Sequence, residues 1–300
     1  MKDDNPFRYC GEYYDEETGE VYLRARYYQP NIGRFLTRDS YTGQDDEPQS
    51  LHLYTYCEND GVNAWDPSGH YPDIMAAAEM SNHIMTAKKK EEENTVIRSE
   101  WTFIDRYKRG GLIMGIYKSS RTGEYCVVNK GTTFKNLNNW KNNFQQPFGY
   151  SADMKKSITK AKKFVKKIKK STNEIRKEIT FVGYSKGGAE AAANAVATNK
   201  NCILFNPATV NLSAYGLNAN NYSASMTAYI VEGEILSILF GCVSKPIGNV
   251  VYLPSQYKAA YGEWYEFWKN AKEMINSLDY PIQNHMMDAV IKALKEKGYK

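Results

Sequence analysis

A single serine stands between two glycines at the point where an apolar run ends and a small-residue helix is expected to begin. The stretch FVGYSKGGAEAAANA, residues 181–195, has Ser185 at the centre of a Gly-x-Ser-x-Gly pattern. A sharp strand-to-helix turn there lifts the hydroxyl above a sheet, and it needs Gly183 and Gly187 because side chains would collide with neighbouring elements. The pattern predicts a nucleophile, although a glycine-rich connection with a polar serine is the plainer alternative.

Strand and helix patterns alternate around this stretch. Strands are expected at 111–118, 124–130, 178–184, 202–206, 227–232 and 249–254, and helices at 137–144, 151–170, 187–197, 257–278 and 285–297. Such alternation predicts an α/β domain with a mainly parallel sheet and helices on both faces.

A serine hydrolase of this layout needs an acid and then a histidine after the serine. His285 is the only histidine that follows Ser185 in the sequence. It is expected at a loop–helix junction, where an imidazole can reach the top of the sheet and act as general base. A surface histidine at a helix N-terminus is the alternative.

The acid is expected just past the end of a core strand. In YIVEGEIL, Glu234 follows the Gly233 turn, whereas Glu232 is expected within the strand. Glu234 is therefore preferred over Glu232 as the triad acid. The other acids between serine and histidine, Glu190 among them, are expected on helix surfaces.

Two backbone donors are expected for an oxyanion. Lys186 would donate its N–H from the start of the helix, where the helix dipole also favours negative charge. Thr132, in the loop Lys130-Gly131-Thr132-Thr133 after a strand, would supply the second donor. An ordinary turn is the alternative for this loop.

Composition excludes several classes of protein. Residues 1–70 hold 6 Lys and Arg against 14 Asp and Glu, and the remainder holds 33 against 20, so two modules with different partners are expected. The five scattered cysteines form no CxxC pair, which argues against a disulfide framework or a zinc site. The polar, acidic N-terminus is not expected to be a signal peptide, and the apolar stretch 235–243 is too short to span a bilayer.

In the first module, residues 20–29 and 51–57 alternate side-chain types as strands do, so two strands are expected there. This module resembles the C-terminal end of an Rhs-repeat-associated core. The matching residues run from NPFRYCGEYYDEETGEVYLRARYY through GRFLTRDS to LYTYCENDGVNAWDPSGH. The resemblance implies that 1–70 is a β-rich core remnant and that a toxin domain follows it. Residues 71–98 carry a KKKEEE charge run and little periodic apolar pattern at their end, so a short helix followed by a linker is expected there, with the toxin domain at 99–300. Asp39 and Asp66 match the motif positions of self-cleaving relatives, but His70 stands where those relatives have Leu or Met, which argues against self-cleavage.

The second module resembles the α/β-hydrolases of the class 3 lipase type, especially a bacterial branch attached to Rhs toxins. The matching segments are KGTTFKNLNNWKNNF, FVGYSKGGAEAAANA, ILFNPATVN, YIVEGEILS and NHMMDAVIKAL. The resemblance implies Ser185 as nucleophile, Glu234 as acid, His285 as base, and Thr132 and Lys186 as oxyanion donors. The acid is Glu where that family generally has Asp.

These observations together predict a toxin that hydrolyses acyl esters of membrane phospholipids without a metal or cofactor. Its expected partners are lipid, a cognate immunity protein and an Rhs shell or secretion system, with no nucleic acid. Synthesis is expected in the bacterial cytoplasm, followed by export to target-cell membranes. The lysine-rich helix 151–170 would attract an anionic membrane, or is simply a solvated face. The alternatives are a metal-dependent nuclease toxin and an inactive hydrolase fold that serves as a binding module.

Overall fold

The computed structural model divides the chain into two units, Met1–Asp73 and Ile74–Lys300. It describes residues 6, 8, 12–23, 26–38, 52–59, 74–88, 94–120, 123–131, 151–171, 179–240, 246–257 and 279–299. Asp39, Asp66, His70 and Thr132 lie outside these residues, as do the helices expected at 137–144 and 257–278.

The first unit contains a small antiparallel sheet. Its strands pair in chain order: β1 (Tyr13–Asp15), β2 (Glu20–Leu23), β3 (Arg26–Gln29) and β4 (Arg34–Phe35). Residues 20–29, expected as one strand, therefore form two strands that pair with each other. A small apolar cluster that includes Phe35 lies beneath, and the Arg26 guanidinium stacks 3.4 Å above the Phe35 ring. Residues 51–57 were also expected as a strand, but Thr55 makes only an isolated bridge to Arg34 among the described residues.

Within the described residues, the second unit has one sheet of eight strands in which spatial order follows chain order. The first four strands are antiparallel to one another, and β8 to β12 are parallel. The strands are β5 (Val96–Ile97), β6 (Trp101–Arg109), β7 (Leu112–Ser119), β8 (Tyr125–Asn129), β9 (Ile179–Tyr184), β10 (Asn201–Phe205), β11 (Met226–Val231) and β12 (Asn249–Leu253). The expected fold class, a mainly parallel sheet with helices preceded by a small β-rich part, is confirmed.

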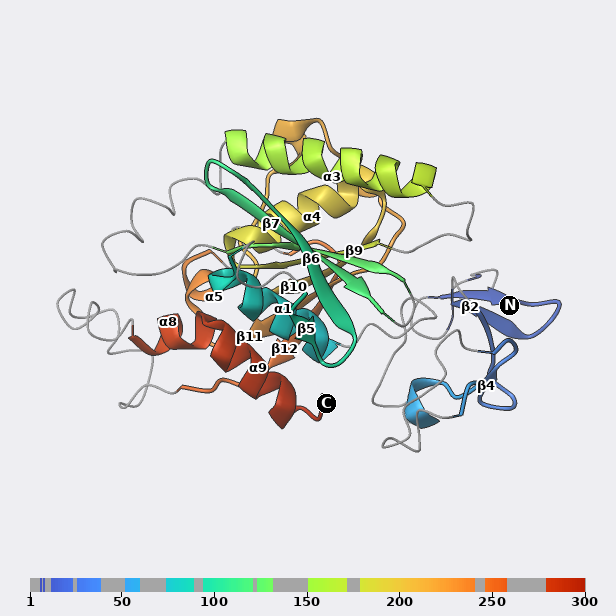
Figure 1. Ribbon diagram of the computed structural model, residues 1–300. Helices are drawn as coiled ribbons and strands as arrows, with labels where there is room; N and C mark the ends of the chain where they lie inside the picture. Colours follow the sequence, from blue (N-terminus) through green and yellow to red (C-terminus); the bar gives the residue numbers. More distant parts are fainter. Residues whose placement is uncertain are drawn as a thin grey trace. The chain divides into compact units, whose positions relative to one another are not determined.

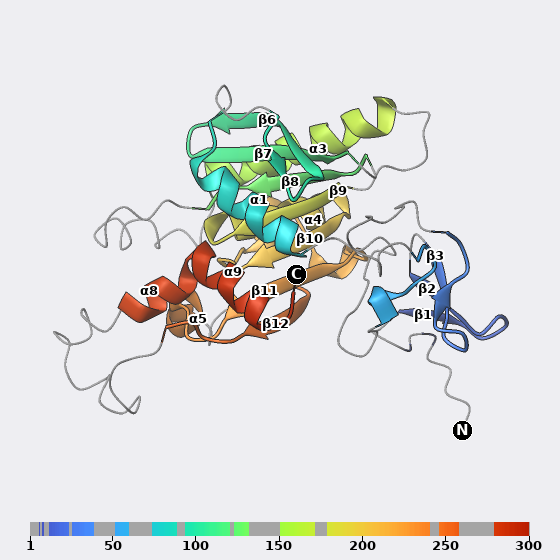
Figure 2. The same cartoon turned by 60° about the horizontal axis from the view of Figure 1, so that its bottom comes forward.

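Helices cover both faces of this sheet (Figure 1). On one face lie α3 (Ala152–Ser171) and α4 (Lys186–Thr198), and on the other lie α1 (Ile74–Thr86) and α9 (Met287–Glu296). Figure 2 shows α1 and α9 in front of the strands, with α3 behind. The apolar residues of α3 recur at helical spacing and are buried: Met154, Ile158, Ala161, Val165 and Ile168.

Two short helices complete the edge of the sheet at which the parallel strands end. Helix α5 (Ile235–Phe240) follows β11, and α8 (Asp279–His285) precedes α9. The helix expected at 285–297 therefore begins two residues later, at Met287. None of the described helices has both the length and the apolar character needed to cross a bilayer.

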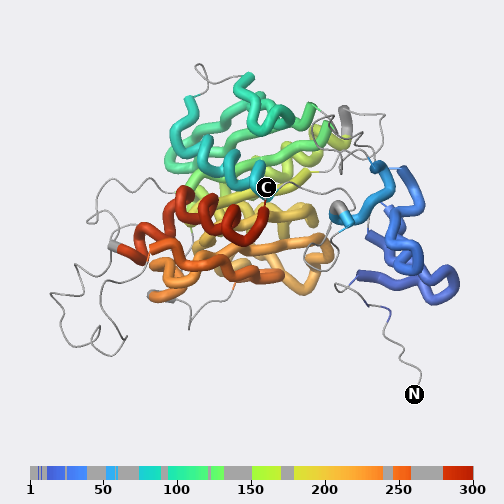
Figure 3. Tube along the Cα trace, turned by 90° about the horizontal axis from the view of Figure 1, so that it is seen from below, coloured from blue at the N-terminus to red at the C-terminus, as the bar shows by residue number. Residues whose placement is uncertain are grey.

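Helix α1 corrects the expected linker at 71–98. A short helix is expected there, but α1 is part of the core: Met75, Met80 and Ile84 are buried in the same apolar cluster as Val290 of α9. In Figure 3, the cyan α1 and the red α9 lie side by side across the sheet. The sequence signal was weak because alanines and methionines give α1 little contrast between its faces.

We expect Ile84→Ala to lower the free energy of unfolding by about 2 to 5 kcal/mol, because it leaves a cavity in the core. Asn82→Ala, at an exposed position on the same helix, removes no core contact and should not lower it by more than about 0.5 kcal/mol. Urea denaturation of both variants measures the difference. Equal, small effects would mean that α1 behaves as a linker after all.

Candidate active site

Ser185 lies in a strained turn between β9 and α4. Its backbone angles, φ 55° and ψ −127°, fall in a region that non-glycine residues rarely adopt. A Cβ at Gly183 would overlap the backbone carbonyl of Gly187, and a Cβ at Gly187 would overlap that of Asn129. The two glycines are therefore required by close backbone contacts, as the sequence pattern predicts.

The structure brings together Ser185, His285 and Glu234 from three distant parts of the chain. His285 Nε2 lies 3.0 Å from Ser185 Oγ, and His285 Nδ1 lies 2.6 Å from Glu234 Oε2. All three side chains are buried, with 2% or less of each residue exposed. A serine hydroxyl, an imidazole and a carboxylate in this order form a proton-transfer chain.

Both oxygens of the Glu234 carboxylate take part in hydrogen bonds. Besides His285, it accepts hydrogen bonds from the Leu236 N–H and from the N–H and hydroxyl of Ser237, at the start of α5. Burial alone raises the pKa of Glu234, but these hydrogen bonds and the attraction of His285 outweigh burial and hold the pKa below its usual value. Glu234 is therefore a carboxylate, able to orient the imidazole and to stabilise its protonated form.

Glu232 has a different environment. Strand β11 ends at Val231, so Glu232 lies in the turn and not in the strand as expected. Its side chain is exposed, while its backbone N–H donates to Leu253. Of the two candidate acids, the structure places Glu234 next to the imidazole.

Asn206 holds the histidine segment in place, a role that the sequence analysis did not find. Its amide nitrogen donates to the carbonyls of Asn284 and His285, at 3.1 and 3.0 Å. Its amide oxygen accepts the N–H of Val231, at the end of β11. One fully buried side chain therefore ties the end of the acid's strand to the base. The sequence signal that could have indicated this role is an asparagine directly after β10, the strand that follows the nucleophile helix α4.

Asn284 fixes the same segment from the other side. Its amide oxygen accepts the N–H groups of Gln256 and Tyr257, and its nitrogen donates to Ser255 Oγ and to the Tyr257 carbonyl. The residue before the base is thus bound to the chain that follows β12. Together, Asn206 and Asn284 explain how an imidazole at the end of the short helix α8 keeps one position.

The expected oxyanion donors are described only in part. Lys186 is the first residue of α4, and the first N–H groups of a helix have no acceptor within it. Thr132 lies outside the described residues, but Gly131 packs against Tyr184, where a Cβ would meet the Tyr184 carbonyl at 2.8 Å. The loop after β8 therefore reaches the turn that carries Ser185.

The chain is similar to a described protein family, to individual relatives and to a solved lipase. The model of a family described as phospholipase-like, a Tle-like phospholipase domain, matches residues 76–260. The chain is similar to the tRNA nuclease WapA of Bacillus subtilis (44% identity over 75 residues) and to toxin protein Tse5 of Pseudomonas aeruginosa (41% over 64 residues). These matches cover 25% and 21% of this chain but 3% and 5% of the two relatives. A solved triacylglycerol lipase from Penicillium expansum aligns with 61% of this chain and 79% of its own, at 14% identity and a TM-score of 0.42.

The contrast between the two glutamates can be tested directly. Glu234→Gln should lower kcat on a soluble ester by about 10³- to 10⁴-fold, because the imidazole loses its orienting carboxylate. Glu232→Gln removes the same charge two residues away and should stay within about twofold. Steady-state kinetics of both purified variants measure the effect. A larger loss in Glu232→Gln would overturn Glu234 as the acid.

Proposed function

Since the chain belongs to the family of Tle-like phospholipase domains, we propose that it hydrolyses acyl esters of membrane phospholipids, with Ser185 as the nucleophile. The observation that carries this proposal is the hydrogen-bonded series Ser185–His285–Glu234 at the end of a parallel sheet. A buried serine that contacts an imidazole held by a carboxylate is the arrangement that acyl transfer requires.

Catalysis would proceed through an acyl-enzyme. Ser185 Oγ attacks the ester carbonyl carbon as its proton passes to His285 Nε2, and Glu234 stabilises the imidazolium. The carbon–oxygen bond to the alcohol then breaks, and His285 returns the proton to the leaving oxygen. Water, deprotonated by His285, attacks the acyl group and releases the fatty acid and Ser185. The Lys186 N–H and a donor from the Thr132 loop would bind the oxyanion during both formation and hydrolysis of the acyl-enzyme.

The outer face of α3 supports a negatively charged lipid surface as the site of action. Among the side chains of this helix that the structure describes, six lysines are exposed: Lys155, Lys162, Lys163, Lys166, Lys167 and Lys169. The single acid of the helix, Asp153, lies in its first turn and pairs with Lys156. A cationic face of this kind gains about 1 kcal/mol per lysine near anionic headgroups.

The biological setting we propose is that of an exported bacterial toxin. Support comes from the Rhs-like motifs of residues 1–70 and from the similarity to Tse5, whose name describes a toxin. A cognate immunity protein would protect the producing cell, and an Rhs shell or secretion system would deliver the chain to target-cell membranes. WapA is described as a nuclease, so a nuclease is one competing function. A hydrolase fold that only binds, without catalysis, is the other.

A fluorophosphonate probe separates these functions. It should label the wild type, and Ser185→Ala should abolish both labelling and the hydrolysis of phospholipid vesicles, because the attacking oxygen is gone. The double variant Ser185→Ala/His285→Ala should be hardly slower than either single variant, since the residues act as one unit. Absence of labelling in the folded wild type would overturn the proposal in favour of the nuclease or the binding module.

The lysine face gives an independent prediction with a matched control. Lys162→Glu/Lys166→Glu should weaken binding to vesicles that contain anionic phospholipid by at least about tenfold, while hydrolysis of a soluble ester is unchanged. Lys292→Glu/Lys295→Glu changes the net charge equally, at exposed positions on α9, and should have a smaller effect. Co-sedimentation at low salt and at about 1 M, where the Debye length is about 3 Å, measures the difference. Equal losses in the two variants would assign the effect to net charge alone.

A further inference from the structure

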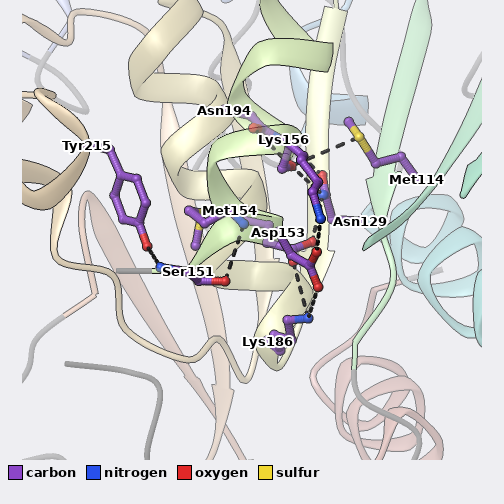
Figure 4. Close-up of polar contacts among 11 residues, drawn as sticks. Met114, Asn129, Ser151, Asp153, Met154, Lys156, Lys186, Asn194 and Tyr215 are labelled. Atoms are coloured by element: carbon purple, nitrogen blue, oxygen red, sulfur yellow. Dashed lines mark hydrogen bonds and ion pairs between the residues drawn. The ribbon is translucent and has the colours of Figure 1, made fainter. Parts of the chain in front are cut away.

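A second buried polar cluster lies beneath the nucleophile turn and takes no direct part in the proton-transfer chain. It joins β8, α3 and α4 through Asn129, Ser157, Glu190 and Asn194. Each of these residues is 1% exposed or less. Figure 4 shows Asn129 and Asn194, which are hydrogen-bonded to each other, and it shows Asp153 between Lys156 and Lys186.

Hydrogen bonds within the cluster form a closed set. The Asn129 amide nitrogen donates to Ser157 Oγ and to Glu190 Oε2, each at 3.0 Å. Asn194 donates to Asn129 Oδ1 at 3.1 Å and to Ser157 Oγ at 2.9 Å. Asn129, the last residue of β8, is therefore held rigidly by two helices.

Glu190 connects this set to the start of α4. Its Oε1 lies 3.6 Å from the Lys186 ammonium, which also lies 3.9 Å from Asp153. Oε1 itself is buried without a hydrogen-bond partner among the described residues. Glu190 thus touches the residue that follows the nucleophile and, through Asn129, the strand that leads into the Thr132 loop.

Burial of a carboxyl group at this position costs desolvation free energy. Burial, opposed in part by Lys186 and Asn129, raises the pKa of Glu190 from 4.5 to about 7. The charged groups that face it are Lys186 on its own helix and Asp153 on α3, with Lys156 paired to Asp153. A glutamine of the same shape would avoid the desolvation of the charge, so a structural role alone does not account for the carboxyl group.

We propose that Glu190 is a positioning residue that, through Lys186 and Asn129, sets the spacing between the start of α4, which carries the Lys186 N–H, and the end of β8. This inference rests on the proposed function. The Lys186 N–H is an oxyanion donor of the proposed mechanism, and Gly131, two residues after the end of β8, packs against Tyr184 beside the nucleophile. An ionised Glu190 attracts the Lys186 ammonium and accepts the hydrogen bond from Asn129. One carboxylate therefore anchors both segments.

This role makes the stabilisation of the transition state depend on the charge of Glu190. Protonation removes the attraction to Lys186 and leaves a neutral group that resembles glutamine. The wild type should therefore approach Glu190→Gln as the pH falls through about 7. Titrations that the two enzymes share cancel in the ratio of their kcat values, so this ratio isolates Glu190.

The test compares kcat and KM of the wild type and Glu190→Gln on a soluble ester between about pH 5.5 and about pH 8.5. At the upper limit we expect kcat of the variant to be about tenfold lower than that of the wild type, with KM within about twofold. This loss is smaller than the roughly 10²- to 10³-fold loss that follows complete removal of an oxyanion donor, because the donors are displaced and not removed. At the lower limit the two kcat values should agree within about twofold. A ratio that stays constant with pH, or equals one throughout, would overturn the inference.

Thermal unfolding of the same proteins distinguishes positioning from structural damage. A folded-state pKa raised above the unfolded value means that the wild type loses stability as the pH rises from about 4.5 to about 7. Glu190→Gln lacks this loss, so its Tm should exceed that of the wild type at about pH 8.5 even though its kcat is lower. A Tm and a kcat that fall together would indicate a structural role and overturn the inference.

A double-mutant cycle tests the link between Glu190 and Lys186. Lys186→Met keeps the backbone N–H and the aliphatic stem, and it should lower kcat about as much as Glu190→Gln; the double variant should be no slower than either. Val165→Ala, a core change on α3, is the control for general destabilisation and should leave kcat unchanged. Multiplicative losses would overturn the link between Glu190 and Lys186. An inactive wild type would instead overturn the proposed function, and this inference with it.

Discussion

The close contact between β9, α4 and β8 at the Ser185 turn is the constraint on which the rest of the second unit depends. Ser185 is held at φ 55°, and the backbone carbonyls of Gly187 and Asn129 leave no room for a Cβ at Gly183 or Gly187. Such a conformation costs on the order of 1 to 3 kcal/mol and persists only where the surroundings determine it fully. Those surroundings are a buried parallel sheet and an alanine-rich helix that packs closely on it.

The buried pair of Glu234 and His285 is the second costly feature. A carboxylate with almost no exposure is destabilising unless every oxygen is satisfied. Here the backbone of α5, the Ser237 hydroxyl and the imidazole satisfy both oxygens. Asn206 and Asn284 then fix the histidine segment against β11 and the chain after β12, so three sequence-distant elements meet at one point. The site is therefore rigid before any substrate binds.

Both faces of the sheet contribute to the site. Helices α3 and α4 carry the Glu190 cluster beneath the nucleophile turn, while α9, packed beside α1, follows the segment that carries His285. The outer face of α3 is cationic, whereas its inner face is apolar except for Ser157, which belongs to the cluster. One helix thus supports the turn from within and presents charge to the exterior.

The sequence alone determined the features that are local. The glycines around Ser185, the helical spacing of α3 and the position of His285 after the serine could all be found in it, because each rests on a short pattern or on chain order. The preference for Glu234 rested on its place after a turn, and the structure puts that side chain beside the imidazole.

The tertiary structure decided what depends on contacts between distant residues. Asn206 looked like any residue that ends a strand, and its two acceptors lie on α8, far along the chain. Glu190 was expected on a helix surface because an alanine-rich helix shows no polar face, yet α3 and β8 bury it. Helix α1 was assigned to a linker for the same reason, since its alanines and methionines acquire an inner face only when α9 and the sheet pack against them. Burial is a property of the packed chain, so a sequence without contrast between its faces does not reveal it.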